Sequence, residues 1–224
     1  MLKIVEHKPI VLFIPTIGCN DRIFKAIDNA RENFKEAFIV VWNDCCCNKQ
    51  IQKLDQVADE VIISNNYIGP NRAAAFGALC LEYDYFVFSA DDTIFPLNYW
   101  QMIWDYFCKY KPLAIGENHR VQEIVEPVKA SEDFYWDGPF IVPQKTIREY
   151  GSFTPHAGYY GFGMMKEFQK RLNHDVLIVR TGVQNLGSEG RNFAISNMPE
   201  GFIKGEMERG ELRAEEYYKK WWQI

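Results

Sequence analysis

The stretch YFVFSADD, residues 85–92, decides how the rest of the chain is interpreted. Its first half is apolar and predicts a buried strand, and its second half ends in two adjacent carboxylates, Asp91 and Asp92. Like charges at contact distance repel each other, and a divalent cation such as Mg²⁺ or Mn²⁺ removes that cost. The pair therefore predicts a site for a metal ion and a diphosphate at the end of a strand. The alternative is a solvated turn that caps the next helix.

Outward from this stretch, the first half of the chain alternates apolar runs with helical patterns. Strands are predicted at residues 10–14, 37–42, 60–63 and 85–89, and helices at residues 21–34, 48–57 and 71–81. Pro15 is expected to end the first strand. The alternation predicts a single α/β domain, Rossmann-like, with a central, mostly parallel sheet flanked by helices.

Ligands of such sheets bind beyond the carboxyl ends of the strands. Three polar strand exits should therefore share one edge: Pro15-Thr16, Asn43-Asp44 and residues 89–92. The second half is less regular. It predicts helices at residues 98–110, 147–151, 164–172 and 211–222, a strand at residues 176–180, and loops at residues 130–139 and 155–163.

Composition excludes several classes of protein. The net charge of −5 argues against binding to duplex nucleic acid, which needs a basic face. No apolar run approaches about 18 residues, so no integral membrane segment is expected. The first ten residues lack the apolar core of a signal peptide. The six cysteines follow neither a disulfide framework nor zinc-ligand spacing, and free thiols indicate a reducing compartment, the cytoplasm.

In their order and spacing, these motifs resemble the nucleotide-sugar glycosyltransferases of the A-type fold, most closely the large inverting family 2. The resemblance covers residues 9–192. It rests on the motifs at residues 13–16, 40–44, 66–75, 89–92, 138–140, 151–153 and 164–171, where residues 89–92 take the place of the family's metal motif, the DXD motif, usually Asp-x-Asp-Asp.

The resemblance implies a UDP-sugar or other nucleotide-sugar donor and an Mn²⁺ or Mg²⁺ ion. Asp91 and Asp92 would hold the metal, and Asn185 falls where the family often has a late histidine. The donor-binding residues would be Pro15, Thr16, Asn43, Asp44, Arg72, Ala90 and Asp91. Asp44 could instead be an ordinary cap at the end of a strand. Arg72 could instead be a solvated arginine at the start of a helix.

Two departures from the family pattern concern the chemistry. Ser89 replaces the first acid of the metal motif, and no acid precedes the helix that ends in Arg171. An inverting transfer needs a base to deprotonate the acceptor hydroxyl. Asp137 is the first candidate, with Trp136 beside it as a face for sugar stacking, and His156 is the second. Asp137 could instead be a turn residue and His156 a structural one. Without a base, retention of configuration becomes the alternative.

The expected function is metal-dependent transfer of a sugar to a hydroxyl of a glycan or glycoprotein, with inversion. Residues 1–224 would form one domain, with a donor half at residues 9–96 and an acceptor half at residues 97–224. A non-catalytic module of the same fold that binds a nucleotide or glycan is one alternative. A sugar-nucleotide pyrophosphorylase is another, but residues 17–20 lack the expected glycine-rich loop.

Overall fold

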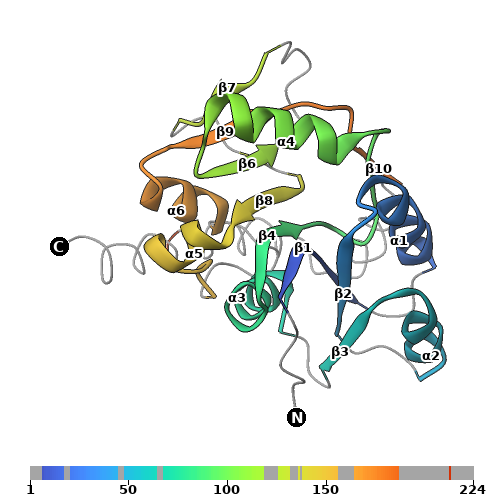
Figure 1. Cartoon of the computed structure of the whole chain (residues 1–224). Coiled ribbons are helices and arrows are strands. Elements are labelled where there is room, and N and C mark those ends of the chain that lie inside the picture. Colours follow the sequence, from blue (N-terminus) through green and yellow to red (C-terminus); the bar gives the residue numbers. More distant parts are fainter. Residues whose placement is uncertain are drawn as a thin grey trace, which may run out of the picture.

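The computed structural model describes residues 7–17, 21–44, 48–64, 68–118, 126–131, 136, 138–155, 164–186 and 212. Figure 1 shows the arrangement of its elements. The helices are α1 (Arg22–Asn33), α2 (Asn48–Val57), α3 (Pro70–Cys80), α4 (Tyr99–Tyr110), α5 (Gln144–Tyr150) and α6 (Met164–Arg171). The strands are β1 (Lys8–Ile17), β2 (Ala37–Asp44), β3 (Glu60–Ser64), β4 (Tyr83–Phe88), β5 (Thr93–Ile94), β6 (Ala114–Glu117), β7 (Val128–Lys129), β8 (Phe140–Pro143), β9 (Val176–Val179) and β10 (Gln184–Asn185).

The main sheet has eight strands in the order β3-β2-β1-β4-β8-β6-β9-β7. β3, β2, β1 and β4 are parallel, whereas β8 is antiparallel to both β4 and β6. β4 and β6 therefore point the same way, and β9 runs parallel to β6. The carboxyl ends of β1, β2, β3, β4, β6 and β9 consequently lie on one edge. The predicted mostly parallel α/β sheet is confirmed.

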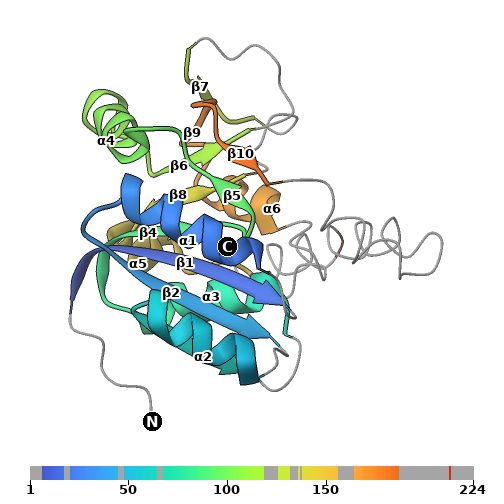
Figure 2. The same ribbon diagram turned by 90° about the vertical axis from the view of Figure 1, so that its right-hand side faces the viewer.

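Helices cover both faces of this sheet (Figures 1 and 2). On one face α1, α2 and α4 pack on the sheet, with Ile27, Leu54 and Ile103 in a shared apolar cluster. On the other face α3, α5 and α6 contribute to a second cluster, which contains Ala74 and Phe168. A sheet buried on both faces explains why its central strands are almost continuously apolar.

Pro15 does not end the first strand, so that prediction was wrong. β1 continues to Ile17 and pairs with β2 from Ile10 to Ile17, with Pro15 opposite Trp42. The backbone N–H of Ser89 donates to the carbonyl of Phe13, so Phe13 faces β4. Pro15, two residues further on, faces the same side beyond the last β1–β4 pair. Its missing N–H therefore costs no ladder hydrogen bond.

The other elements of the first half lie within a few residues of their predicted bounds, and α2 matches them. Asp21 occupies the N-cap position of α1 without a side-chain cap hydrogen bond. The short strands β5, β6, β7 and β10 were not predicted. Most of residues 155–163 and 211–222 lie outside the described residues, as do four of the cysteines. Cys80 and Cys108 are exposed free thiols.

Within the described part of the chain, no helix combines the length and the apolar character needed to cross a membrane.

Candidate functional site

The three predicted strand exits do meet at one edge of the sheet. Thr16 lies opposite Asn43 in the β1–β2 register, and Asp44 is the last residue of β2. β4 ends at Phe88, and the N–H of Ser89 bonds back to β1. In a parallel sheet this edge is where ligands bind.

A hydrogen bond joins the first and third of these exits. The Thr16 hydroxyl donates to Oδ2 of Asp91 at 2.7 Å, although the two residues are 75 positions apart in the sequence. Residues 90–93 form the turn that presents Asp91, closed by a bond from the Thr93 N–H to the Ala90 carbonyl. Thr16 is buried, whereas Asp91 and Asp92 are both partly exposed. Asp91 is thus held by Thr16, and both carboxylates are partly accessible to solvent.

Ser89, the departure from the metal motif, is buried at the base of this turn. Its hydroxyl faces the carbonyl of Ala90 at 3.4 Å. A carboxylate at this position would be desolvated, which is costly without a paired charge. The serine therefore fits a buried position and leaves the two exposed acids as the metal-ligand candidates.

The segment that contains Asn185 lies directly beside this turn. β10 pairs antiparallel with β5, with Asn185 opposite Thr93, and the Leu186 N–H donates to the carbonyl of Asp92 at 2.7 Å. Asn185 itself is exposed. Asn185, the third predicted metal ligand, thus lies opposite the residue that follows Asp92. Among the described residues, no group of three His, Cys, Asp or Glu side chains could hold a metal ion.

Asp44 is almost fully buried and fixes the loop that enters α3. Its Oδ1 accepts a hydrogen bond from Nε1 of Trp42 at 2.8 Å, and its Oδ2 accepts from the N–H groups of Ile68 and Gly69 at 3.3 and 3.1 Å. These bonds fit the strand-end cap that was its alternative role. They also hold the start of α3 at the ligand edge.

Asn43 has no exposed surface, and neither its side-chain oxygen nor its nitrogen has a hydrogen-bond partner within the part of the chain that the structure describes. Unpaired buried amides are rare in folded proteins. Arg72 is exposed in the first turn of α3, and its Nε lies 3.4 Å from the carbonyl of Pro155. Contacts of either residue with a donor stay predictions.

Of the residues predicted to bind the acceptor, the structure describes only Trp136. Asp137 and His156 lie outside the described residues, so their roles stay predictions. Trp136 is 1% exposed and stacks on Phe140, with ring centroids 4.4 Å apart and an interplanar angle of 8°. It also packs against Gly116 of β6. The prediction that Trp136 offers a face for sugar stacking was wrong, because this ring belongs to the core.

Sequence reasoning missed a buried polar group at the exit of β6. Glu117 is 1% exposed, and its carboxylate accepts hydrogen bonds from the hydroxyl and the N–H of Thr181 at 2.7 and 3.2 Å. Burial raises the pKa of the Tyr99 phenol well above its usual range, and the charge of Glu117 raises it further. The signal was the run Ala114–Glu117, a short apolar segment that ends in a polar residue as β2 does.

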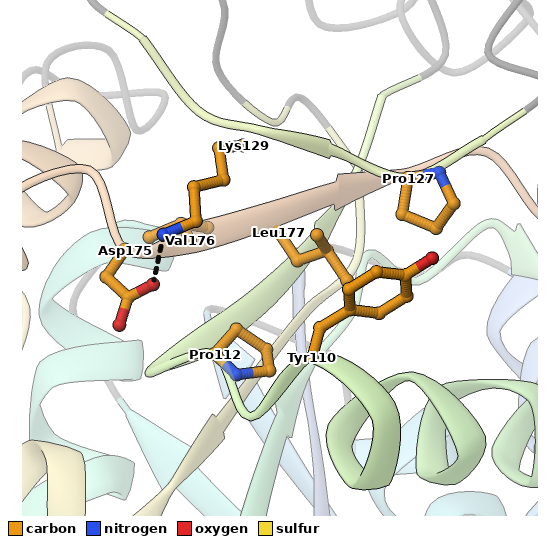
Figure 3. A pocket seen from close by; sticks show the side chains of 7 residues that line it. All are labelled: Tyr110, Pro112, Pro127, Lys129, Asp175, Val176 and Leu177. Atoms are coloured by element: carbon orange, nitrogen blue, oxygen red, sulfur yellow. Dashed lines mark hydrogen bonds and ion pairs between the residues drawn. The ribbon is translucent and has the colours of Figure 1, made fainter.

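A further hollow, of about 170 Å³, lies away from the ligand edge. It is formed where α4 ends and β9 begins, and Figure 3 shows Tyr110 and Pro112 beside the ion pair of Lys129 and Asp175. Lys129 Nζ and Asp175 Oδ1 are 3.4 Å apart, and the Lys129 side chain is largely exposed whereas that of Asp175 is partly exposed. The hollow includes none of the residues of the strand exits.

No family model and no curated protein sequence matches the chain. Solved structures do match. TarS 1–349 of S. aureus, in complex with UDP-GlcNAc, is 11% identical with a TM-score of 0.58, over 77% of this chain and 56% of that one. GalNAc-T7 with UDP, GalNAc and Mn²⁺ is 13% identical with a TM-score of 0.65, over 80% and 44%. The mannosyltransferase PcManGT of Pyrobaculum calidifontis, with GDP-Man and Mn²⁺, is 10% identical with a TM-score of 0.60, over 98% and 77%.

The chain covers only 35% of another TarS chain that it matches. At such low identity the likeness concerns the fold, since one fold can support several functions. The resemblance predicted from the motifs is confirmed at that level: this chain has the A-type glycosyltransferase fold.

Proposed function

We propose that this protein is a metal-dependent glycosyltransferase that transfers a sugar from a nucleotide-sugar donor, a UDP-sugar first, to a hydroxyl of a glycan or glycoprotein. The observation that carries the proposal is the Asp91–Asp92 turn, bonded to Thr16 at the ligand edge of this fold. Both carboxylates are partly exposed at that edge, where a ligand can reach them.

The residues at the turn fit an Mn²⁺ or Mg²⁺ ion. Asp91 and Asp92 supply carboxylate oxygens and Asn185 supplies an amide oxygen, and such hard oxygen ligands suit both cations. These ions commonly take one or two carboxylates and leave their other positions to phosphate and water. A bound metal would take up negative charge from the departing diphosphate. The hydrogen bond from Thr16 would keep Asp91 oriented toward the ion.

Donor binding would use the other strand exits. Pro15 and Thr16 would flank the base, Asp44 or Asn43 at the end of β2 would face its edge, and Ala90 would lie beside the ribose. Arg72 would contact the diphosphate, because its exposed guanidinium lies in the first turn of α3, where helix N–H groups also favour anions. The solved structures of similar fold hold UDP-GlcNAc in one case and GDP-Man in another, so both nucleotides belong in the test.

Acceptor chemistry depends on the base. Asp137 and His156 remain the candidates for an inverting transfer, and the acceptor half at residues 97–224 would present them. Replacement of the true base should abolish transfer to the acceptor while leaving donor binding intact. If neither residue is required, the anomeric configuration of the product, measured by NMR, distinguishes inversion from retention.

The test is a panel of UDP- and GDP-sugars, assayed for release of the nucleotide with Mn²⁺ or Mg²⁺ present. We expect Asp91→Asn and Asp92→Asn to lower the rate by on the order of 100- to 1000-fold, as the loss of transition-state charge stabilisation does. Asp84→Asn, an exposed carboxylate at the start of β4, is the matched control and should keep the native rate.

Binding of UDP and Mn²⁺ without turnover of any donor would favour the non-catalytic module instead. A native protein that neither binds nor hydrolyses any donor in a metal-dependent way would overturn the proposal. So would full activity of the double variant of Asp91 and Asp92.

A further inference from the structure

Glu117 binds the segment that leads into β10, one of two short strands beside the candidate metal turn. β5 and β10 form a two-stranded sheet, called here the β5–β10 ribbon, defined by Thr93–Ile94 and Gln184–Asn185. The ribbon adjoins Asp92, whose carbonyl accepts the N–H of Leu186. Two short strands have little stability of their own, so their position depends on what fixes their ends.

The first fixed end is the segment before β10. Both oxygens of Glu117 bind Thr181, which lies three residues ahead of Gln184. Gly182 then takes a φ of +94°, a backbone conformation that favours glycine, and Val183 is buried in the core. Thr181 is therefore the last polar anchor before the chain enters the ribbon.

The second fixed end is the segment after β5. Phe95 exchanges two hydrogen bonds with the side chain of Asn29 on α1, at 2.7 and 3.1 Å. The chain then enters α4 at Tyr99, which is fully buried and feels the charge of Glu117. Glu117 thus contacts the segment before β10 directly, whereas on the other side its charge acts on Tyr99, five positions after the end of β5.

Glu117 is itself rigidly held. Its N–H donates to the carbonyl of Pro139 at 2.9 Å, and its carbonyl accepts from the N–H of Gly138 at 3.1 Å. A carboxyl group that is 1% exposed is stable only while its hydrogen bonds are kept. With its oxygens directed at Thr181, it is placed to support the ribbon and not to touch a substrate.

We propose that Glu117 is a positioning residue for the candidate metal turn, acting through Thr181 on the β5–β10 ribbon that holds Asp92 and Asn185 in place. The metal-binding role of Asp92 and Asn185 rests on the proposed function, whereas the support of the ribbon does not.

The experiment measures three properties of Glu117→Gln and Thr181→Val. Amide hydrogen exchange at Leu186 reports opening of the ribbon, and it should become on the order of 10- to 100-fold faster. The Kd for UDP with saturating Mn²⁺, and the Mn²⁺ concentration for half-maximal rate, should each rise about tenfold because the ligands are no longer held in place. Thr181→Ser keeps the hydroxyl, so its hydrogen exchange, its Kd for UDP and its Mn²⁺ requirement should equal those of the native protein.

Glu167→Gln is the matched control, because Glu167 is also a buried carboxylate, paired with Arg171 on α6 far from the ribbon. It should lower global stability without selective exchange at Leu186. The proposal is overturned if Leu186 exchanges no faster in Glu117→Gln than in this control at equal global stability. It is also overturned if the ribbon opens while affinity for Mn²⁺ and UDP stays native.

If the native protein does not bind UDP with Mn²⁺, the proposed function is contradicted. Hydrogen exchange at Leu186 then tests only whether Glu117 supports the ribbon. Faster exchange in Glu117→Gln keeps it as the support of the ribbon, and unchanged exchange removes that role as well.

Discussion

The polar residues at the ligand edge divide into two groups by their burial. Thr16, Asp44 and Glu117 are nearly inaccessible to solvent, and each binds another segment of the chain. Asp91 and Asp92 are partly exposed at the same edge. The two acids are accessible to a ligand, and the buried groups fix the segments beside them. The candidate metal site is thus a pair of partly exposed acids next to buried hydrogen bonds.

This division gives Asp44 a measurable structural role. Asp44→Asn replaces one acceptor oxygen by an amide donor, which then faces either Trp42 Nε1–H or the N–H groups of Ile68 and Gly69. We expect the free energy of unfolding to fall by about 1–3 kcal/mol, the cost of a buried group left unsatisfied. Urea denaturation measures it.

Asp84→Asn serves as the comparison, since Asp84 pairs with His7 at the surface and exposed pairs contribute about 0–1 kcal/mol. Equal stability of Asp44→Asn and the native protein would mean that the loop before α3 does not depend on this carboxylate. Asp44 would then be available for the nucleotide alone.

At the scale of elements, the close packing of α3 on β1 depends on small side chains. Ala73, Ala74 and Ala78 are buried against the sheet, and a Cβ on Gly77 would lie 2.6 Å from Cε2 of Phe13. Alanine has the better helix propensity by about 1 kcal/mol, but overpacking a core costs about 1–3 kcal/mol. The steric term is therefore expected to be the larger.

We predict that Gly77→Ala lowers the free energy of unfolding by up to about 2 kcal/mol, the overpacking cost less the gain in helix propensity. Thermal or urea unfolding measures the change. Leu79→Ala, at an exposed position of the same helix, should stay within about 0.5 kcal/mol of native. A more stable Gly77→Ala variant would mean that α3 can move away from Phe13 at little cost.

Elements differ in how well their sequence predicts them. α1, α2 and α3 and the first four strands follow from local periodicity and apolar runs, because each is long enough for its pattern to emerge. β6 has four residues, and β5 and β10 have two each. Such short strands exist only through pairing with distant segments, and no local sequence pattern predicts that pairing.

At the scale of the whole molecule, buried phenols predict a loss of stability at alkaline pH. Burial raises the pKa of Tyr83 and of Tyr99 far above the ordinary value of about 10. Above that pH the unfolded chain loses these protons and the folded chain keeps them. The stabilisation is complete below about pH 10 and declines as pH rises further, by about 1.4 kcal/mol per pH unit for each phenol.

Urea unfolding between pH 8 and pH 11 measures this decline. Tyr83→Phe removes one of the two groups, so its stability should fall less steeply above pH 10. At pH 8 the same variant should be about 1 kcal/mol less stable than native, because the hydroxyl of Tyr83 donates to the carbonyl of Ala78 at 2.7 Å. Identical slopes for both proteins would show that Tyr83 ionises as freely in the folded state as in the unfolded one.

The sequence alone determined the α/β class, the order of the first strands and helices, and the meeting of Thr16, Asp44 and Asp91 at one edge. These follow from local patterns together with a general property of parallel sheets. It also determined that two adjacent acids, Asp91 and Asp92, follow the fourth strand, with Ser89 two positions before the first of them.

Only the tertiary structure decided which of these groups are buried, that Trp136 belongs to the core, and that Glu117 binds Thr181 just before the β5–β10 ribbon. Thr16 and Asp91 are 75 positions apart, and Glu117 and Thr181 are 64. Contacts over such separations depend on the order of strands in the sheet. That order is fixed by the packing of the whole chain, and a local run of residues does not contain it.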